Sequence, residues 1–127
     1  MTAKILLLED DLSMQNLLKT FLRFEGFEVI IQRQQESCEQ VIEAIQQEKP
    51  VAVLMDVNLP KVNGFDVLKA IRAHPELKNT PVIMSSGMDF GERCRTEGAD
   101  AFMLKPYMPD DLVTAIHKAI TSQRSTD

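Results

Sequence analysis

Short runs of consecutive apolar residues recur along the chain with no polar residue between their members. These runs occupy residues 5–8, 51–55, 82–84 and 101–104, and a further run, residues 27–31, is interrupted by Glu28. Uninterrupted apolar runs of this length are typical of strands buried on both faces of a parallel sheet, whereas an interrupted run is typical of an edge strand. The pattern therefore predicts five strands, with residues 27–31 at an edge of the sheet.

Between these runs, apolar residues recur every three or four positions, which predicts helices. The stripes are Leu17, Leu18, Phe21 and Leu22; Val41, Ile42 and Ile45; Phe65, Leu68 and Ile71; and Leu112, Val113, Ile116, Ala119 and Ile120. Residues 88–97 have only a thin stripe, made of Phe90 and Cys94. Five strands alternating with five helices predict an α/β fold of the (βα)5 type. Because such crossovers are right-handed, the sheet should be mainly parallel and covered by helices on both faces.

Polar side chains follow four of the predicted strands. The first is followed by Glu9, Asp10 and Asp11, the third by Asp56, the fourth by Ser86 and the fifth by Lys105. An aspartate after a strand is often only a turn residue, and Asp11 is best explained as the N-cap of the first helix. However, the carboxyl ends of neighbouring parallel strands meet at one edge of the sheet, where ligands bind in open α/β folds. We therefore expect these side chains to form one site.

Crowded carboxylates repel one another and lose hydration, and a hard divalent cation relieves both costs. Oxygen ligands of this kind suit Mg²⁺, and Mn²⁺ could substitute for it. Asp56 could then act as a nucleophile toward phosphorus. Lys105 would neutralise the oxygens of the transferred group, and Ser86 could donate a hydrogen bond to it.

The sequences E-D-D after the first strand, M-D-V-N-L-P after the third and K-P after the fifth resemble the receiver domain of two-component response regulators, of the chemotaxis-regulator type. The resemblance extends over about residues 3–121. It implies a flavodoxin-like, doubly wound three-layer fold with strand order 2-1-3-4-5. It also implies phosphorelay signal transduction through an aspartyl phosphate.

The resemblance assigns roles to the acidic residues and their neighbours. Asp56 matches the phosphoacceptor and a ligand of Mg²⁺, which Asp10 would bind directly and Glu9 through water. Asn58 would offer its backbone carbonyl to the same ion. Lys105 matches the phosphate-binding lysine, whose peptide bond to the following proline is usually cis in the family.

The resemblance also identifies residues of the conformational switch. Ser86 matches the switch hydroxyl, and Gly87 the small residue that leaves room for the phosphoryl group. Phe102 matches the switch aromatic, which we expect to move from an exposed to a buried position. Ser86 and Lys105 lie closer in sequence than is usual in the family, by nearly a helical turn, which predicts a shortened fourth helix.

Length and charge narrow the possible partners. The 127 residues fit one domain, a receiver over residues 1–121 followed by a polar tail, 122–127. The net charge of −5 argues against direct contact with nucleic acid or anionic membranes, since phosphate contacts need clustered basic residues. Two distant cysteines suggest reduced thiols, and no early apolar run is long enough for a signal sequence or membrane span. We therefore expect a cytoplasmic protein.

The function predicted in this way is to accept a phosphoryl group from a sensor histidine kinase or phosphotransfer protein and to change contacts with a downstream effector. We expect a monomer or a phosphorylation-dependent dimer. The module would not be a classical enzyme, although it would catalyse its own phosphorylation and dephosphorylation. A pseudo-receiver that never accepts phosphate is the alternative. A hydrolase using Asp56 is disfavoured because Asn58 replaces a second acid, and a flavin module because acids follow the first strand.

Overall fold

The computed structural model describes residues 3–32 and 37–122 of the chain. Apart from Ser122, the predicted polar tail lies outside the described residues. The elements, in chain order, are β1 (Lys4–Leu8), α1 (Leu12–Phe24), β2 (Glu28–Ile31), α2 (Cys38–Glu48), β3 (Ala52–Asp56), α3 (Gly64–Ala73), β4 (Val82–Ser86), α4 (Gly91–Thr96), β5 (Ala101–Leu104) and α5 (Pro109–Thr121). The predicted alternation of strands and helices is confirmed.

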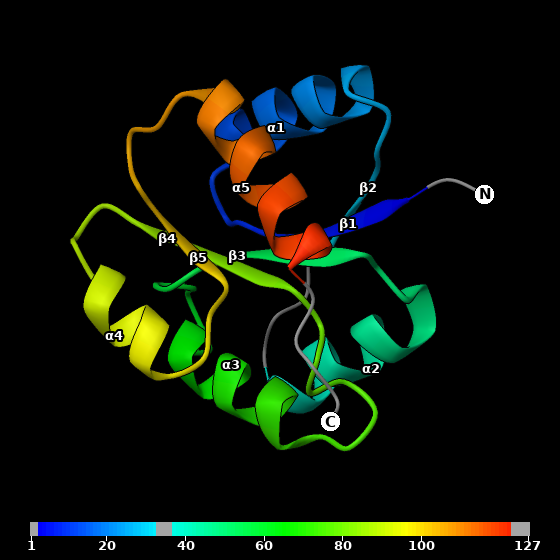
Figure 1. Ribbon diagram of the computed structural model, residues 1–127, viewed down its shortest axis with the longest axis vertical. Helices are drawn as coiled ribbons and strands as arrows, with labels where there is room; N and C mark the ends of the chain where they lie inside the picture. Colours follow the sequence, from blue (N-terminus) through cyan, green and yellow to red (C-terminus); the bar gives the residue numbers. More distant parts are fainter. Residues whose placement is uncertain (1–2, 33–36, 123–127) are drawn as a thin grey trace.

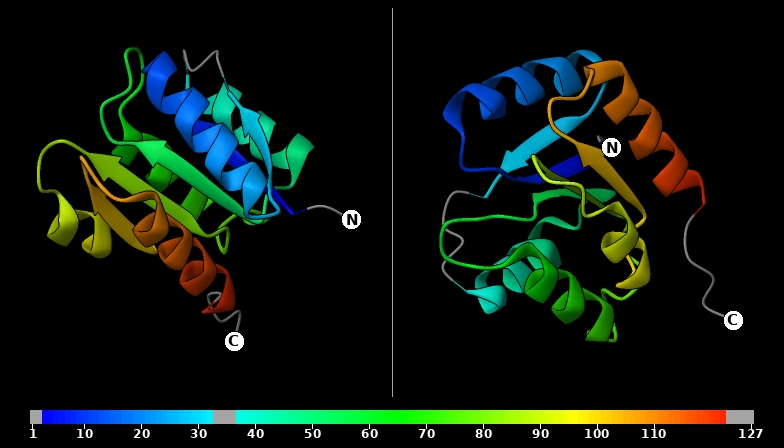
Figure 2. Two further views of the ribbon diagram at one scale, coloured as in Figure 1. Left: turned by 90° about the horizontal axis from the view of Figure 1, so that it is seen from above. Right: turned by 90° about the vertical axis from the view of Figure 1, so that its left-hand side faces the viewer.

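The five strands form one parallel sheet in the order β2-β1-β3-β4-β5, so that β2 is an edge strand as predicted. Helices α1 and α5 cover one face of the sheet, and α2, α3 and α4 cover the other (Figure 1). The right view of Figure 2 shows the same three layers from another side, and the left view looks from above, with α1 and α5 in front of the sheet. This is the flavodoxin-like, doubly wound arrangement that the resemblance implied.

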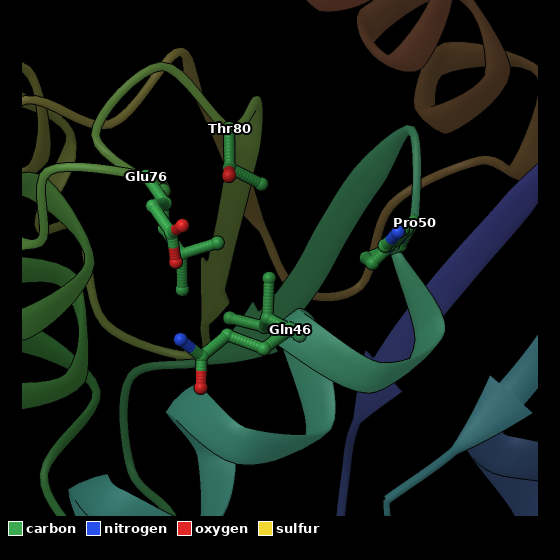
Figure 3. A pocket seen from close by; sticks show the side chains of 7 residues that line it. Gln46, Pro50, Glu76 and Thr80 are labelled. Atoms are coloured by element: carbon green, nitrogen blue, oxygen red, sulfur yellow. The ribbon is translucent and has the colours of Figure 1, made fainter.

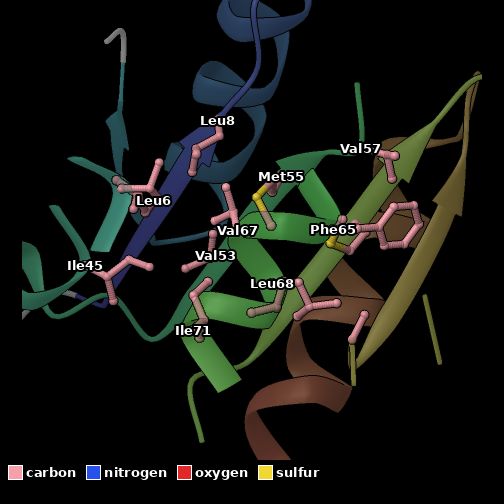
Figure 4. Close-up of a cluster of buried hydrophobic side chains, with 14 of the residues drawn as sticks. Leu6, Leu8, Ile45, Val53, Met55, Val57, Phe65, Val67, Leu68 and Ile71 are labelled. Carbon is pink, nitrogen blue, oxygen red and sulfur yellow. The ribbon is translucent and has the colours of Figure 1, made fainter. Parts of the chain in front are cut away.

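Apolar residues of the inner strands alternate between two separate cores. In β1, Ile5 and Leu7 face α1 and α5, whereas Leu6 and Leu8 face the other helices. Figure 4 shows the second core, in which β1 and β3 pack against α2 and α3. Both faces of these strands must be apolar because helices cover both, which is why their sequences lack polar alternation.

Local sequence signals explain where several helices begin and end. The Asp11 side chain accepts a hydrogen bond from the Met14 backbone N–H at 3.1 Å, which confirms Asp11 as the N-cap of α1. Asn63 caps α3 in the same way, through the Phe65 N–H at 2.8 Å. Gly26 has φ +98, a left-handed conformation that ends α1.

Two details differ from the sequence-based expectation. Leu17 belongs to the predicted apolar stripe of α1, yet its side chain is 54% exposed, because only one side of that stripe reaches the sheet. Strand β4 also continues through Ser85 and Ser86, which are buried, although the apolar run ends at Met84.

Helix α4 has only six residues, which confirms that the fourth helix is short. Its N-cap residue, Phe90, makes no side-chain capping hydrogen bond. The chain turns away at Gly98, which has φ +102. In residues 3–32 and 37–122, every helix is too short or too polar to cross a lipid bilayer.

Candidate phosphoryl and metal site

The parallel register brings four strand ends to one edge of the sheet. Leu8 pairs with Met55, Asp56 with Ser85, and Ser86 with Leu104, so β1, β3, β4 and β5 end at nearly the same level. The residues that follow these positions therefore lie side by side, although they come from opposite ends of the sequence. The predicted convergence of polar side chains is present in the structure.

Three carboxylates gather at this edge. Glu9, Asp10 and Asp56 each offer one oxygen, and these oxygens all lie within 4.8 Å of one another. Glu9 is 3% exposed and Asp56 is 7% exposed, whereas Asp10 lies open to solvent. Buried like charges at this separation repel one another, so the cluster needs a compensating positive charge.

Lys105 supplies one such charge. Its Nζ atom lies 2.8 Å from Glu9 Oε1 and 2.8 Å from Asp56 Oδ2. Burial by itself would lower the pKa of Lys105, but the hydrogen bonds to Asp56 and Glu9 and their charges raise it to about 12. The ammonium group is therefore held charged between the two acids. The peptide bond from Lys105 to Pro106 is cis, as the resemblance implied.

Backbone N–H groups and one side-chain amide hold the two buried acids in place. The Glu9 carboxylate accepts a hydrogen bond from the Asp11 N–H at 3.2 Å, and the Gln15 side chain donates to the Glu9 carbonyl oxygen. Asp56 Oδ1 accepts from the Asn58 N–H at 3.0 Å. The Asp56 carboxylate thus has one oxygen bonded by the following loop and the other by Lys105.

The Ser86 hydroxyl lies next to this loop and is buried. Its Oγ accepts hydrogen bonds from the Asn58 side-chain Nδ2 at 3.3 Å and from the Met88 N–H at 3.1 Å. Gly87 is exposed, and a Cβ atom added to it would meet nothing within 4 Å, so there is open space beside it. This environment is compatible with the roles expected for Ser86 and Gly87.

Phe102 lies apart from the acidic cluster, on the side of β5 that faces α4. Its ring is half-buried, packs against the core of Figure 4, and lies 3.6 Å from the position of a Cβ at Gly91. The Phe102 side chain thus lies between the exposed and the buried position expected of a switch aromatic, and the expected movement stays a prediction. The thin covering of α4 is sufficient to bury much of the ring.

Sequence reasoning missed Tyr107, which follows the Lys105-Pro106 pair. Its hydroxyl is buried and has no hydrogen-bond partner among residues 3–32 and 37–122. Burial raises the pKa of Tyr107 to about 12, with smaller contributions from Lys105, which lowers it, and from Glu9 and Asp56. Its position two residues after the lysine was the one signal that could have identified it.

A pocket lies at the opposite, amino-terminal edge of the sheet, away from this cluster (Figure 3). Gln46 and Pro50 line it from the end of α2, and Glu76 and Thr80 from the loop after α3. Glu76 is its one acidic lining residue. Its lining therefore lacks the acid cluster and the lysine found at the carboxyl edge.

Comparison with known proteins gives a consistent result. The family model described as "Response regulator receiver domain" matches residues 5–117. A CpxR homologue from Haemophilus influenzae, a transcriptional regulatory protein, is 38% identical over 123 residues, which cover 93% of this chain and 50% of that protein. PdtaR, a transcriptional regulatory protein of Mycobacterium tuberculosis, is 30% identical over 95% of this chain and 58% of that protein. The chain thus spans about half the length of these curated relatives.

Solved structures share the fold. The crystal structure of a putative response regulator from Chloroflexus aurantiacus superimposes with a TM-score of 0.85 and 27% identity, covering 95% of this chain and 99% of that one. Because the match covers nearly the whole of both chains, the two proteins share the same fold.

Proposed function

This chain belongs to the response regulator receiver domain family, and from that premise we propose that Asp56 accepts a phosphoryl group from a phosphohistidine. As a receiver it is a signalling domain and not a classical enzyme. The observation that carries the proposal is the position of Asp56: a buried carboxylate at a strand end, 2.8 Å from the Lys105 ammonium and beside Glu9 and Asp10.

The transfer is a simple exchange of bonds. A carboxylate oxygen of Asp56 attacks phosphorus and forms an O–P bond while the N–P bond of the phosphohistidine breaks. The electron pair of that bond stays on the imidazole nitrogen, which leaves as neutral imidazole when its other nitrogen carries a proton. The Lys105 ammonium moves from the Asp56 carboxylate to an oxygen of the incoming group, and Ser86 donates a hydrogen bond to another. These residues also serve autophosphorylation by small phosphodonors and hydrolysis of the product.

The residues also fit a divalent cation. Oxygens of Glu9, Asp10 and Asp56 lie within 4.8 Å of one another, and carboxylate oxygens are the ligands that Mg²⁺ prefers, with Mn²⁺ as a substitute. Asp10 and Asp56 would bind the ion directly, Glu9 through water, and Asn58 through its backbone carbonyl. When bound, the ion supplies positive charge that offsets the phosphoryl oxygens.

We assign the receiver domain to residues 1–121, with 122–127 as a polar tail. Its partners would be a sensor histidine kinase or phosphotransfer protein upstream and an effector protein or domain downstream, in the cytoplasm. Phosphorylation would alter these contacts or convert a monomer to a dimer. Direct binding to nucleic acid or membrane forms no part of the proposal.

Acetyl phosphate with Mg²⁺ tests the acceptor. Intact-mass spectrometry should find one added phosphoryl group on the wild type and none on Asp56→Asn, which keeps the shape but loses the nucleophilic charge. Asp66→Asn, the same change at an exposed acid of α3, should be labelled like the wild type. Full labelling of Asp56→Asn would refute the assignment, and an unlabelled wild type would identify the chain as a pseudo-receiver.

A further inference from the structure

The Ser86 hydroxyl already accepts two hydrogen bonds, so the only further hydrogen bond open to it is one that it donates. A serine hydroxyl has two acceptor sites and one proton to donate. In this structure the Asn58 side-chain Nδ2 occupies one acceptor site at 3.3 Å, and the Met88 N–H occupies the other at 3.1 Å. Both lone pairs are therefore engaged, and the O–H proton is left to be donated.

That proton has no partner among the residues that the structure describes. Ser86 is 1% exposed, and among residues 3–32 and 37–122 the hydroxyl makes no hydrogen bond other than the two that it accepts. A buried donor without an acceptor is costly, so a ligand that offers an acceptor oxygen at this point gains free energy from the contact. A cation would gain nothing, because no lone pair is available to it.

Asn58 is well placed to control this hydroxyl because it belongs to the loop that carries the phosphoacceptor. Its backbone N–H donates to Asp56 Oδ1 at 3.0 Å, and its backbone pairs with Asn63 in an isolated antiparallel bridge. The start of its side chain is thus fixed relative to Asp56, and its amide reaches across to β4. One residue therefore bonds both the acceptor carboxylate and the switch hydroxyl.

We propose that the Asn58 side chain is a positioning residue, which holds the Ser86 hydroxyl with its proton directed toward a phosphoryl group on Asp56. The inference rests on the proposed function and adds a specific role for the asparagine. This role belongs to the side-chain amide of Asn58, and it is separate from the role of its backbone carbonyl, which is expected to face the metal.

The proposed role also explains why an amide, and not a carboxylate, occupies position 58. An aspartate could only accept, and would capture the Ser86 proton itself.

Beryllofluoride, a mimic of the phosphoryl group, is a suitable probe at a Mg²⁺ concentration that saturates each variant. Its dissociation constant should be measured by calorimetry for the wild type, Asn58→Ala, Ser86→Ala and the double variant. Loss of a positioning hydrogen bond in Asn58→Ala should weaken binding by about 3- to 10-fold. In the Ser86→Ala background the same change should alter binding by less than about 2-fold, because nothing remains to be positioned.

Asn58→Asp tests the direction of the hydrogen bond. It is nearly isosteric with asparagine but has no N–H to donate, so it should weaken beryllofluoride binding more than Asn58→Ala does. Its added negative charge also repels the anion, and comparing Ser86→Ala with the Ser86→Ala, Asn58→Asp double variant measures that repulsion alone. If Asn58→Asp weakens beryllofluoride binding more when Ser86 is present than in the Ser86→Ala background, the difference measures the effect of reversing the hydrogen bond to Ser86.

The outcomes separate the two proposals. A wild type that binds no beryllofluoride overturns the proposed function, and this inference with it. A wild type that binds normally, with Asn58→Ala equal to it or tighter, overturns only the inference. Equal losses from Asn58→Ala in the wild-type and Ser86→Ala backgrounds also overturn it, since Asn58 would then act independently of the hydroxyl.

Discussion

At the scale of single residues, Lys105 sets the charge balance of the site. Its ammonium group lies 2.8 Å from both Glu9 and Asp56, two acids that are almost completely buried. Removing one partner of a buried ion pair leaves an uncompensated charge, which costs far more than an exposed pair contributes. Lys105 therefore allows the acid cluster to exist without a metal, and its two contacts are the ones that a phosphoryl group and a cation would replace.

Tyr107 allows the burial of this region to be measured directly. It is the single tyrosine of a chain without tryptophan, so tyrosinate absorbance reports on this residue alone. Burial raises the pKa of Tyr107 from 10.0 to about 12, and a spectrophotometric titration should find the midpoint there. The denatured protein should titrate near the ordinary value and serves as the control. A native midpoint equal to the denatured one would show that water reaches the hydroxyl.

The same shift predicts how stability changes at high pH. Between about pH 10 and pH 12 the unfolded protein loses the Tyr107 proton before the native protein does, so the free energy of unfolding falls as pH rises. The raised pKa of Lys105 acts in the same direction between about pH 10.5 and 12. Tyr107→Phe should therefore reduce the alkaline loss without abolishing it. At neutral pH the free energy of unfolding of Tyr107→Phe should be at least that of the wild type and up to about 1 kcal/mol higher, since the change removes a buried hydroxyl with no partner in the described part of the chain.

At the scale of elements, the short α4 is fixed at both of its ends. At its start, Phe90 stacks edge-on against Phe65 with ring centroids 5.7 Å apart, and the Arg93 guanidinium lies 3.9 Å over the Phe65 ring. Beyond its end, Arg72 donates to the Gly98 carbonyl at 2.9 Å. Six residues suffice for a stable helix here because α3 supplies the contacts that extra turns would otherwise provide.

The start of α3 approaches the end of β3 closely at Gly64. A Cβ atom added to Gly64 would lie 2.8 Å from the Asp56 carbonyl oxygen and 2.8 Å from Val57 Cα, both of them backbone atoms that cannot move aside. Gly64→Ala should therefore lower the free energy of unfolding by about 1–3 kcal/mol, as measured by urea denaturation. Gly87→Ala is the matched control, since its Cβ would meet nothing within 4 Å, and it should change stability by less than about 0.5 kcal/mol. Equal stability of the two variants would contradict the close approach.

At the scale of the whole molecule, the site exists because of sheet order. Glu9 and Lys105 lie 96 positions apart in sequence, yet β1 and β5 flank the β3-β4 pair and bring both residues to Asp56. The two helical layers hold these strands in register from both faces. Burial of apolar side chains in the two cores supplies the free energy that offsets the conformational entropy lost when the acids are brought together. A ligand that relieves the repulsion among the carboxylates should therefore raise the free energy of unfolding of the whole domain.

Mg²⁺ should consequently stabilise the folded protein. For a dissociation constant of about 1 mM and about 10 mM metal, mass action gives roughly 1.4 kcal/mol, which corresponds to a rise of about 4 °C in melting temperature. Asp10→Ala should abolish most of this rise and leave the metal-free form no less stable, because it removes a like charge from the cluster. Glu43→Ala, at an exposed position of α2, should respond to Mg²⁺ like the wild type. Melting curves that ignore Mg²⁺ in the wild type would argue against the metal site.

The local pattern of the sequence was enough to determine which segments form strands and helices and which polar residues end the strands, whereas the short fourth helix followed from the spacing usual in the family. These features depend on residues within about one helical turn of each other, or on whether both faces of a strand are buried. Both can be recognised from the order of apolar and polar residues in a short segment. Parallel connection then placed Glu9, Asp56, Ser86 and Lys105 at one edge.

Only the tertiary structure decided which of these groups touch. The bridge from Lys105 to Glu9 and Asp56, and the contact of Asn58 with Ser86, depend on side-chain directions across strands that are 28 to 96 positions apart. The exposure of Leu17, the half-burial of Phe102 and the lack of a partner for the Tyr107 hydroxyl among the described residues likewise depend on how another layer packs. Such contacts result from packing between distant segments, and packing is a property of the assembled fold.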